Sequence, residues 1–283
     1  MTKSKETLKR IAIFQDTLKR INENSILSSF ADAAIEDTKI FDCSVCPIIS
    51  SELKERNQSI SVTQHRSFEA ASILHKQFPD KKIAVLNFGN AFYAGGGVNQ
   101  GASAQEESLC RTSTLYHVLN SQRLFRYFYK NNRSRTKFKG QDLIAYTPDI
   151  IVFKSDTLFP ETLPESEWFK VDIITAAAPD LRRPMDYQFP TENYYPVSDA
   201  ELFAIHVKRA VHILSAAAFM EADILVLGAF GCGAFKNDPR VVADAYKTVL
   251  NRFPKYFSHI EFAVYSGEEL TNFNVFNEVL GTY

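Results

Sequence analysis

Hydrophobic positions along this chain follow two spacings, one typical of amphipathic helices and one typical of buried strands. Near the N-terminus, apolar residues from Leu8 to Ile21 recur at helical spacing among charged residues, which predicts a helix packed on the core. Two short, mostly apolar runs at 83–88 and 223–227 are instead typical of strands buried on both faces. The chain therefore combines a buried sheet with helices that cover it.

Helical and strand patterns alternate from residue 61 onwards. Helices are predicted near residues 67–77, 200–218 and 241–251, and strands near residues 83 and 150 and at 171–175, 223–227 and 260–265. This alternation predicts an α/β domain. The basic stretch 130–139 and the proline-rich stretch 179–196 are expected to be exposed loops, the second of them beside a functional site.

Composition limits the class of protein. With 283 residues, 45% of them hydrophobic, the chain can bury a large core, as one domain or as a core with a smaller cap. Lysine and arginine total 32 against 33 acids, so we expect no direct nucleic-acid binding, although Arg111, Arg182 and Arg183 could form a local positive patch. Glu6 and Asp16 interrupt the N-terminal segment and no stretch resembles a membrane span, so we expect a cytoplasmic protein without a membrane partner.

Cysteine and histidine spacing does not indicate a metal site. Cys43 and Cys46 form a C-x-x-C pair, but no second pair follows, and the histidines show no H-E-x-x-H spacing. Cys232 lies between glycines, where a small residue that allows close backbone approach explains it better than a nucleophile, because no histidine is near in sequence. We therefore expect neither a metal nor a cofactor.

The segment after the strand at 83–88 carries the strongest functional signal. Three glycines at 95–97 are followed, seven residues later, by Gln105, Glu106 and Glu107. Glycine lets a backbone approach a ligand with its amides unshielded, and carboxylates at a helix start can perform acid–base chemistry. Each feature alone is typical of an ordinary loop or helix start. Together, after a buried strand, they indicate a functional site.

The helix that begins there is expected to run to Leu119, with Ser103 as its N-cap. Neighbouring helical residues point about 100° apart, so we do not expect Glu106 and Glu107 to aim at one atom, and one should act while the other positions the substrate. The helix dipole favours ionised carboxylates, whereas a like-charged neighbour and an apolar pocket favour protonated ones.

A second glycine-rich turn, at 228–235, follows the strand at 223–227. Pro239 then opens a helix capped by Asn237 or Asp238. A strand, a glycine loop and a helix start in this order can cradle a diphosphate. The turn fits neither G-x-G-x-x-G nor a P-loop, which counts against ordinary dinucleotide dehydrogenases and ATPases. The two glycine loops could clasp one ligand from both sides.

The glycine triplet, the seven-residue gap and the Gln-Glu-Glu run resemble the signature of the poly(ADP-ribose) glycohydrolases. Three further stretches, 67–71, 146–153 and 173–179, resemble the microbial branch of that family. The resemblance covers roughly residues 60–265, and the first ~55 residues match less distinctly.

This resemblance implies a macrodomain-like, three-layer α/β/α fold with a mixed central β-sheet. An N-terminal helical extension, 1–60, would pack on a catalytic core, 61–283. The implied activity is hydrolysis of ribose–ribose O-glycosidic bonds without a metal or cofactor, releasing ADP-ribose. The implied partners are ADP-ribose and poly(ADP-ribose) on modified proteins, and the protein would be a monomer.

The resemblance also implies residue roles. Glu107 would protonate the leaving ribose oxygen and then activate water, while Glu106 and Gln105 would hold the terminal ribose and Phe235 would pack on the distal ribose. One acid/base residue aided by the substrate's own diphosphate suits neighbouring glutamates better than the two separated carboxylates of ordinary glycosidases. The residues expected to bind substrate are Asn87, Gly95, Gly96, Gly97, Val98, Asn99, Gln105, Gly228, Gly231, Cys232, Gly233, Ala234 and Phe235.

Two other functions use the same pocket. A hydrolase of mono-ADP-ribosyl linkages or of O-acetyl-ADP-ribose would take its specificity from residues 98–104 and from the loop after Pro179. The second of these functions is that of a non-catalytic ADP-ribose reader. Binding a diphosphate needs neither glutamate, so the presence of both counts against a reader. A part for Asp156 in catalysis stays open. Candidates to pack on the adenine are Phe88, Tyr93, Phe230 and Phe273.

Overall fold

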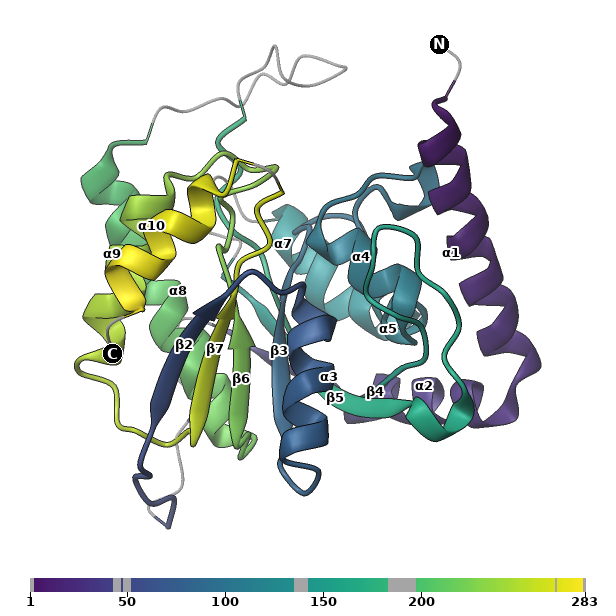
Figure 1. Cartoon of the computed structure of the whole chain (residues 1–283), viewed down its shortest axis with the longest axis horizontal. Helices are drawn as coiled ribbons and strands as arrows, with labels where there is room; N and C mark the ends of the chain where they lie inside the picture. The colour runs from purple at the N-terminus through teal and green to yellow at the C-terminus, as the bar shows by residue number, and fades with distance from the viewer. Residues whose placement is uncertain are drawn as a thin grey trace.

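A seven-stranded mixed sheet forms the centre of the molecule (Figure 1). The computed structural model describes residues 3–42, 47, 52–134, 142–182, 197–267 and 269–281. The strand order is β1-β4-β5-β3-β6-β7-β2. Strands β5, β3, β6, β7 and β2 run parallel, and β4 pairs antiparallel with both β5 and β1. The strands are β1 (Lys39–Phe41), β2 (Ser59–Thr63), β3 (Ile83–Phe88), β4 (Ile144–Val152), β5 (Phe169–Ala176), β6 (Ile224–Leu227) and β7 (His259–Ala263).

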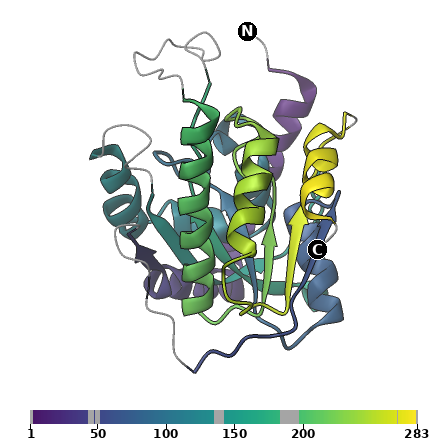
Figure 2. The ribbon, with the colours of Figure 1, turned by 90° about the vertical axis from the view of Figure 1, so that its left-hand side faces the viewer.

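Helices cover both faces of the sheet (Figures 1 and 2). One face carries α8 (Asp199–Phe219), α9 (Pro239–Leu250) and α10 (Thr271–Leu280). The other carries α1 (Lys5–Glu23), α2 (Ser25–Asp37), α3 (Ser67–Gln77), α4 (Gln105–Thr112) and α5 (Leu115–Leu119). Separate hydrophobic clusters lie on the two faces. The predicted three-layer α/β/α fold with a mixed sheet is confirmed. Shorter elements are α6 (Gln122–Leu124), α7 (Lys130–Ser134), the 3-10 turns η1 (Val98–Gln100) and η4 (Glu165–Glu167), and the π-helical turn η2 (Phe125–Tyr129).

The two apolar runs singled out in the sequence become neighbouring central strands. Strand β3 pairs in parallel with β6, so both end at the same edge of the sheet. The two glycine loops follow these strands directly and therefore emerge side by side, although they lie far apart in sequence. This adjacency builds a ligand site at the carboxyl ends of the strands.

Helix α1 of the N-terminal segment packs on the core. Phe14 of α1 is buried in the cluster on the α3 side of the sheet. Strand β1 joins the same sheet by pairing with β4, and β2 already begins at Ser59. The segment 1–60 thus contributes strands as well as helices, and its status as a separate unit stays a prediction.

The helix expected to run from Gln105 to Leu119 is divided into α4 and α5. Ser113 adopts an extended backbone and forms an antiparallel bridge to Val152 at the end of β4. The Ser113 hydroxyl donates to the carbonyl of Leu109 (2.8 Å) and accepts from the N–H of Leu115 (3.2 Å). Pairing with a distant strand therefore interrupts a helical pattern that the local sequence favours.

The prediction of a loop at 130–139 is wrong for its first five residues, because Lys130–Ser134 forms α7. Asn132 is buried there, and its amide donates to the carbonyl of Ala91 (3.2 Å). Of the expected loop at 179–196, residues 183–196, with Arg183, lie outside the described residues. Helix α8 is long and apolar enough to suit a membrane span, but most of that stretch is buried inside the molecule.

Candidate active site

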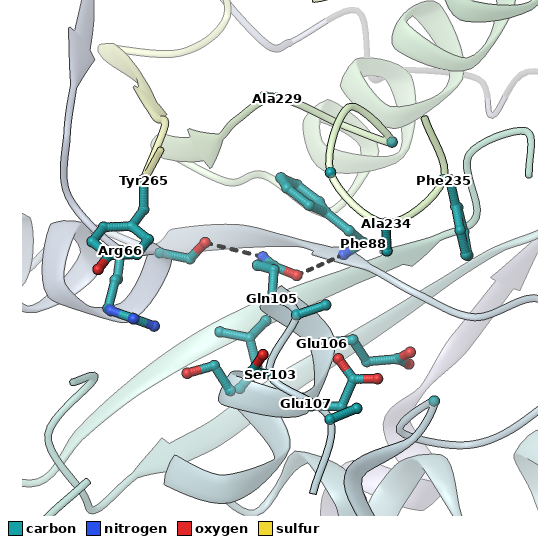
Figure 3. Close-up of a pocket in the computed structure, with 18 of the residues that line it drawn as sticks. Arg66, Phe88, Ser103, Gln105, Glu106, Glu107, Ala229, Ala234, Phe235 and Tyr265 are labelled. Carbon is teal, nitrogen blue, oxygen red and sulfur yellow. Dashed lines mark hydrogen bonds between the residues drawn. The ribbon is translucent and has the colours of Figure 1, made fainter. Parts of the chain in front are cut away.

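A cavity of about 690 Å³ opens at the carboxyl ends of the central strands. Both glycine loops, the first turn of α4, the start of α3 and the segment after β7 line it. Figure 3 shows Glu106 and Glu107 on the first turn of α4 and Phe235 on the second glycine loop. The two motifs identified in the sequence therefore meet in one cavity.

Gln105 fixes the first turn of α4 to the end of β3. Its carbonyl oxygen accepts from the N–H of Phe88 (2.9 Å), and its amide nitrogen donates to the carbonyl of Leu86 (2.7 Å) and to the Ser67 hydroxyl (3.0 Å) (Figure 3). These bonds hold the turn that carries both glutamates. For Gln105 to contact the terminal ribose as expected, the ribose would have to bond to the same Gln105 side-chain oxygen that accepts from the N–H of Phe88. The expected cap is wrong: Ala104 occupies the N-cap, while Ser103 lines the cavity.

Glu106 is a buried carboxyl group, with 4% of its surface exposed. Its Oε2 accepts from the N–H of Asn90 (2.8 Å), and its Oε1 has no hydrogen-bond partner among the described residues. Burial raises the pKa of Glu106 well above its ordinary value, and the negative charge of Glu107 adds to this, while the Asn90 N–H opposes it. A protonated Glu106 is therefore favoured.

Glu107 lies against the glycine triplet. Its Oε1 accepts from the N–H of Gly97 (2.9 Å), and its buried Oε2 has no hydrogen-bond partner in the described part of the chain. A Cβ added at Gly96 would lie 2.5 Å from Glu107 Oε1 and 3.1 Å from Glu106 Oε2. Only glycine fits between these carboxylates, and its φ of +54° also favours glycine. Glu106 and Glu107 bond to different N–H groups, those of Asn90 and Gly97, so they do not aim at one atom, although an oxygen of each lies close to Gly96.

The remaining residues expected in the first loop divide between two environments. Gly96 and Gly97 line the cavity. Val98 is fully buried beneath the loop, and the amide of Asn99 donates to the Tyr116 hydroxyl (3.0 Å) outside the cavity. Asn87 is buried under the site, where its amide nitrogen donates to the Thr175 hydroxyl (3.2 Å) and its Oδ1 lacks a partner among the described residues. Gly95 also lies outside the cavity lining.

The second loop contributes Gly231, Gly233, Ala234 and Phe235 to the cavity, whereas Gly228 and Cys232 do not line it. Burial raises the pKa of the Cys232 thiol, which disfavours the reactive thiolate and fits the expected role as a small residue.

Asn237 holds this second loop in shape. Its amide nitrogen donates to the carbonyls of Pro179 (2.7 Å), Gly231 (3.2 Å) and Phe235 (3.1 Å). Its Oδ1 can only accept, so Nε2 of His206 donates to it (2.7 Å). Burial lowers the pKa of His206 to about 4, which keeps the ring neutral at physiological pH. Asp238 alone caps α9, by accepting from the N–H groups of Arg240 and Val241.

Sequence reasoning missed Arg66 and Tyr265, which line the same cavity. The Arg66 guanidinium lies 4.1 Å from the centre of the Tyr265 ring and 3.9 Å from the Asp156 carboxylate. Asp156 accepts from the N–H of Phe68 (2.9 Å) and the hydroxyl of Ser108 (2.9 Å), which joins α3 to α4. Burial raises the pKa of Asp156, and these hydrogen bonds oppose the shift. No local motif marks these residues, because they come from segments that only the fold brings together.

Of the four aromatic candidates for adenine contact, Phe88 lines the cavity. Phe230 is fully buried behind it, with ring centres 5.6 Å apart. Phe273 packs on the core, and Tyr93 faces a different cavity. Among the described residues, no group of three His, Cys, Asp or Glu side chains is placed to hold a metal ion. Cys43 and Cys46 lie outside the described residues.

The profile of a family described as microbial-type PARG, catalytic domain, matches residues 4–155. The chain belongs to this family. PARG denotes poly(ADP-ribose) glycohydrolase, so the resemblance carried by the glycine triplet and the Gln-Glu-Glu run is confirmed. No curated protein matches the sequence.

Solved PARG structures resemble this chain over nearly its whole length. The enzyme from Thermomonospora curvata superposes with a TM-score of 0.80 at 26% identity, covering 96% of this chain and 99% of its own. The enzyme from Deinococcus radiodurans in complex with ADP-ribose gives a TM-score of 0.74 at 30% identity, covering 89% and 97%. The T. curvata enzyme bound to the inhibitor ADP-HPD gives 0.77 at 26% identity, covering 95% and 98%. The PARG match begins at residue 4, so it includes α1 and α2, which the sequence motifs had left less distinct.

Proposed function

We propose that this PARG-family protein hydrolyses the ribose–ribose O-glycosidic bond of poly(ADP-ribose) and releases ADP-ribose. The observation that carries the proposal is the pair of buried carboxylates, each with one oxygen lacking a partner in the described chain, between two glycine loops in one cavity. The likeness to the ADP-ribose complex of the D. radiodurans enzyme supports ADP-ribose as the ligand.

The glycine loops would hold the diphosphate. Gly96 and Gly97 approach from one side and residues 231–235 from the other. Backbone N–H groups in such turns, together with the positive end of α4, favour a bound anion. Phe235 would pack on the distal ribose, and the Arg182 guanidinium, which is paired with Asp180, lies 5.2 Å from the centre of the Phe235 ring.

The two glutamates would divide the chemistry. Burial, with the negative charge of Glu107 as a smaller cause, raises the pKa of Glu106. We assign proton donation to Glu107, the last residue of the family motif, whose Oε2 is directed away from the Gly97 bond. The proton passes to the leaving ribose oxygen as the C–O bond breaks, water adds to the ribose carbon, and its proton returns to Glu107. Glu106, held by the Asn90 N–H, would position the ribose, and the substrate's own diphosphate would stabilise the positive charge that develops on it.

A reader needs neither carboxylate to bind the diphosphate of ADP-ribose. Burying a carboxyl group costs stability, and the raised pKa of Glu106 records that cost. Diphosphate binding uses N–H groups and positive charge, so a reader would tolerate uncharged residues at both positions. The burial of Glu106 and Glu107 therefore favours catalysis.

Metal-independent action, a monomeric state and a cytoplasmic location belong to the same proposal. Acid–base chemistry by a carboxyl group needs no Lewis acid. Turnover that survives exhaustive chelation supports the first point, and analytical ultracentrifugation checks the second.

The deciding experiment measures free ADP-ribose released from poly(ADP-ribosyl)ated protein. We expect release by the native chain, and a loss of at least 100-fold in Glu107→Gln, which keeps the shape of the side chain but cannot donate the proton. Calorimetry should show that Glu107→Gln still binds ADP-ribose. Release that persists in the variant would remove Glu107 from the mechanism. ADP-ribose binding without any release by the native chain would favour mono-ADP-ribosyl linkages or a reader.

A further inference from the structure

Arg111 is a buried positive charge beside the active site. It lies in the last turn of α4, where it is 3% exposed, and it does not line the cavity. The sequence suggested an exposed positive patch that included Arg111, and its burial contradicts this. A guanidinium keeps its charge in a folded protein, and burying a charge costs free energy. Arg111 therefore needs groups that offset the cost of its burial.

Hydrogen bonds join Arg111 to the carboxylate of Glu107 through the first glycine loop. Nη1 of Arg111 donates to the carbonyl of Ala102 (2.6 Å), and the N–H of Ala102 donates to the carbonyl of Gly97 (3.2 Å). The N–H of Gly97 in turn donates to Oε1 of Glu107 (2.9 Å). Glu107 and Arg111 are four residues apart in α4, so their side chains leave the helix on the same face. The bonds and the helix turn form a closed ring that fixes Glu107.

Glu107 is the main negative charge that acts on Arg111. Burial lowers the pKa of Arg111, and the charge of Glu107 opposes this more than any other group does. The other ionisable groups that act on Arg111 are Cys110 of the same helix, Arg10 of α1 and Asp156, which follows β4. Burial raises the pKa of the Cys110 thiol well above its ordinary value, so the thiol is neutral. Arg10 repels Arg111, and the carboxylate of Asp156 has a smaller effect than that of Glu107.

We infer that Arg111 is a positioning residue, which holds Glu107 through the glycine loop and stabilises its ionised form. The inference rests on the proposed function, in which Glu107 gives its proton to the leaving ribose oxygen and later takes one from water. Glu107 becomes negative as the first proton leaves, and a fixed positive charge lowers the energy of this state. A protonated Glu106 carries no charge, so it does not weaken this stabilisation.

The pH dependence of turnover separates this electrostatic effect from a merely structural one. Arg111→Gln removes the charge but keeps an amide that can donate to Ala102. Without the charge, Glu107 gives up its proton less readily, so we expect the kcat–pH profile on poly(ADP-ribose) to move about one unit towards higher pH. Arg111→Lys keeps the charge and should keep the profile in place. A lower kcat in Arg111→Gln without a displaced profile would overturn the inference, as would an equal displacement in Arg111→Lys.

Arg123→Gln is the matched control for the loss of a partly buried arginine. Arg123, on α6, also donates to a backbone carbonyl, that of Thr38 (3.2 Å), but it does not line the active-site cavity. Its substitution should lower Tm without displacing the kcat–pH profile. A profile displaced as far as in Arg111→Gln would overturn the inference, because the displacement would then report lost stability.

A second test needs no activity. Because the charge of Glu107 offsets the burial of Arg111, Arg111→Gln should lower Tm in the native background by about 2 °C or more beyond its effect in the Glu107→Gln background. If Arg111→Gln alone does not fold, the double variant should fold. Equal losses in both backgrounds, or a double variant that also fails to fold, would overturn the inference. Coupled losses in a chain that releases no ADP-ribose would instead overturn the proposed hydrolysis alone.

Discussion

At the scale of single residues, the buried Glu106 suits the proposed chemistry but costs the folded protein stability. Its pKa is raised from an ordinary value of 4.5, chiefly by burial. The folded protein therefore holds this proton more tightly than the unfolded chain does. The contribution of Glu106 to the free energy of unfolding is fully present below about pH 4.5 and is lost as pH rises towards the raised value.

We predict that Glu106→Gln stabilises the protein at pH 8 while lowering its turnover. Glutamine can still accept from the Asn90 N–H but never ionises, so the free energy of unfolding should rise by about 1 kcal/mol or more over the native chain at pH 8, and by less at pH 5. Urea denaturation at both pH values measures this. Glu165→Gln, at an exposed position on η4, is the control and should match the native chain. An equal change at both pH values would contradict the assignment.

At the scale of elements, α1 supports the catalytic turn from outside the cavity. Arg10 Nε donates to the carbonyl of Gly101 (2.7 Å), at the end of the first glycine loop. The Thr17 hydroxyl donates to the carbonyl of Arg111 (2.5 Å) in α4, and Arg111 in turn donates to the carbonyl of Ala102 (2.6 Å). Helix α1 is thus bonded to the loop before the glutamates, at Gly101, and to α4 beyond them, at Arg111.

We expect Arg10→Ala to lower kcat on poly(ADP-ribose) by about tenfold while leaving the far-ultraviolet circular dichroism spectrum unchanged. Loss of the bond to Gly101 lets the glycine loop move relative to Glu107, and small displacements of catalytic groups reduce rates strongly. Arg20→Ala is the control, because Arg20 lies on the same helix and pairs at the surface with Asp16, an interaction that contributes little. Equal effects of the two substitutions would show that α1 acts only through general stability.

At the scale of the whole molecule, the cavity joins loops that follow β3, β6 and β7, so a bound ligand connects separate parts of the sheet. We predict that ADP-ribose at about 100 times its Kd adds roughly 2.7 kcal/mol to the free energy of unfolding and raises Tm by several degrees.

At the same ADP-ribose concentration, Asn237→Ala should reduce this shift, because the second loop loses two hydrogen bonds from Asn237, and with them its link to Pro179, and binds more weakly. Scanning calorimetry measures both. Asn274→Ala, exposed on α10, should retain the full shift, and a full shift in Asn237→Ala would contradict the role given to that residue.

At the scale of the whole molecule, the features that the sequence alone predicts can be compared with those that it does not. Local patterns were sufficient for the two strand and glycine-loop units and for a helix cap at Asn237 or Asp238, because each depends on neighbouring residues. The break at Ser113 depends on Val152, and the Arg66 contacts depend on Asp156 and Tyr265, so neither left a local signal. Asn237 resembled a helix cap because its bonds to distant carbonyls are invisible in sequence. The order of strands in the sheet was likewise beyond a local pattern.

The place of β3 at the centre of the sheet has a consequence for synthesis on the ribosome. Both of its partners, β5 and β6, follow it in the chain, so a nascent polypeptide exposes this apolar strand until they emerge. Such non-local pairing is slow and leaves the growing chain prone to aggregation. The wall of the cavity is complete only when Asn272 has been added, far beyond both glutamates in the sequence. A translation product truncated before that point would lack part of the site while retaining both glutamates.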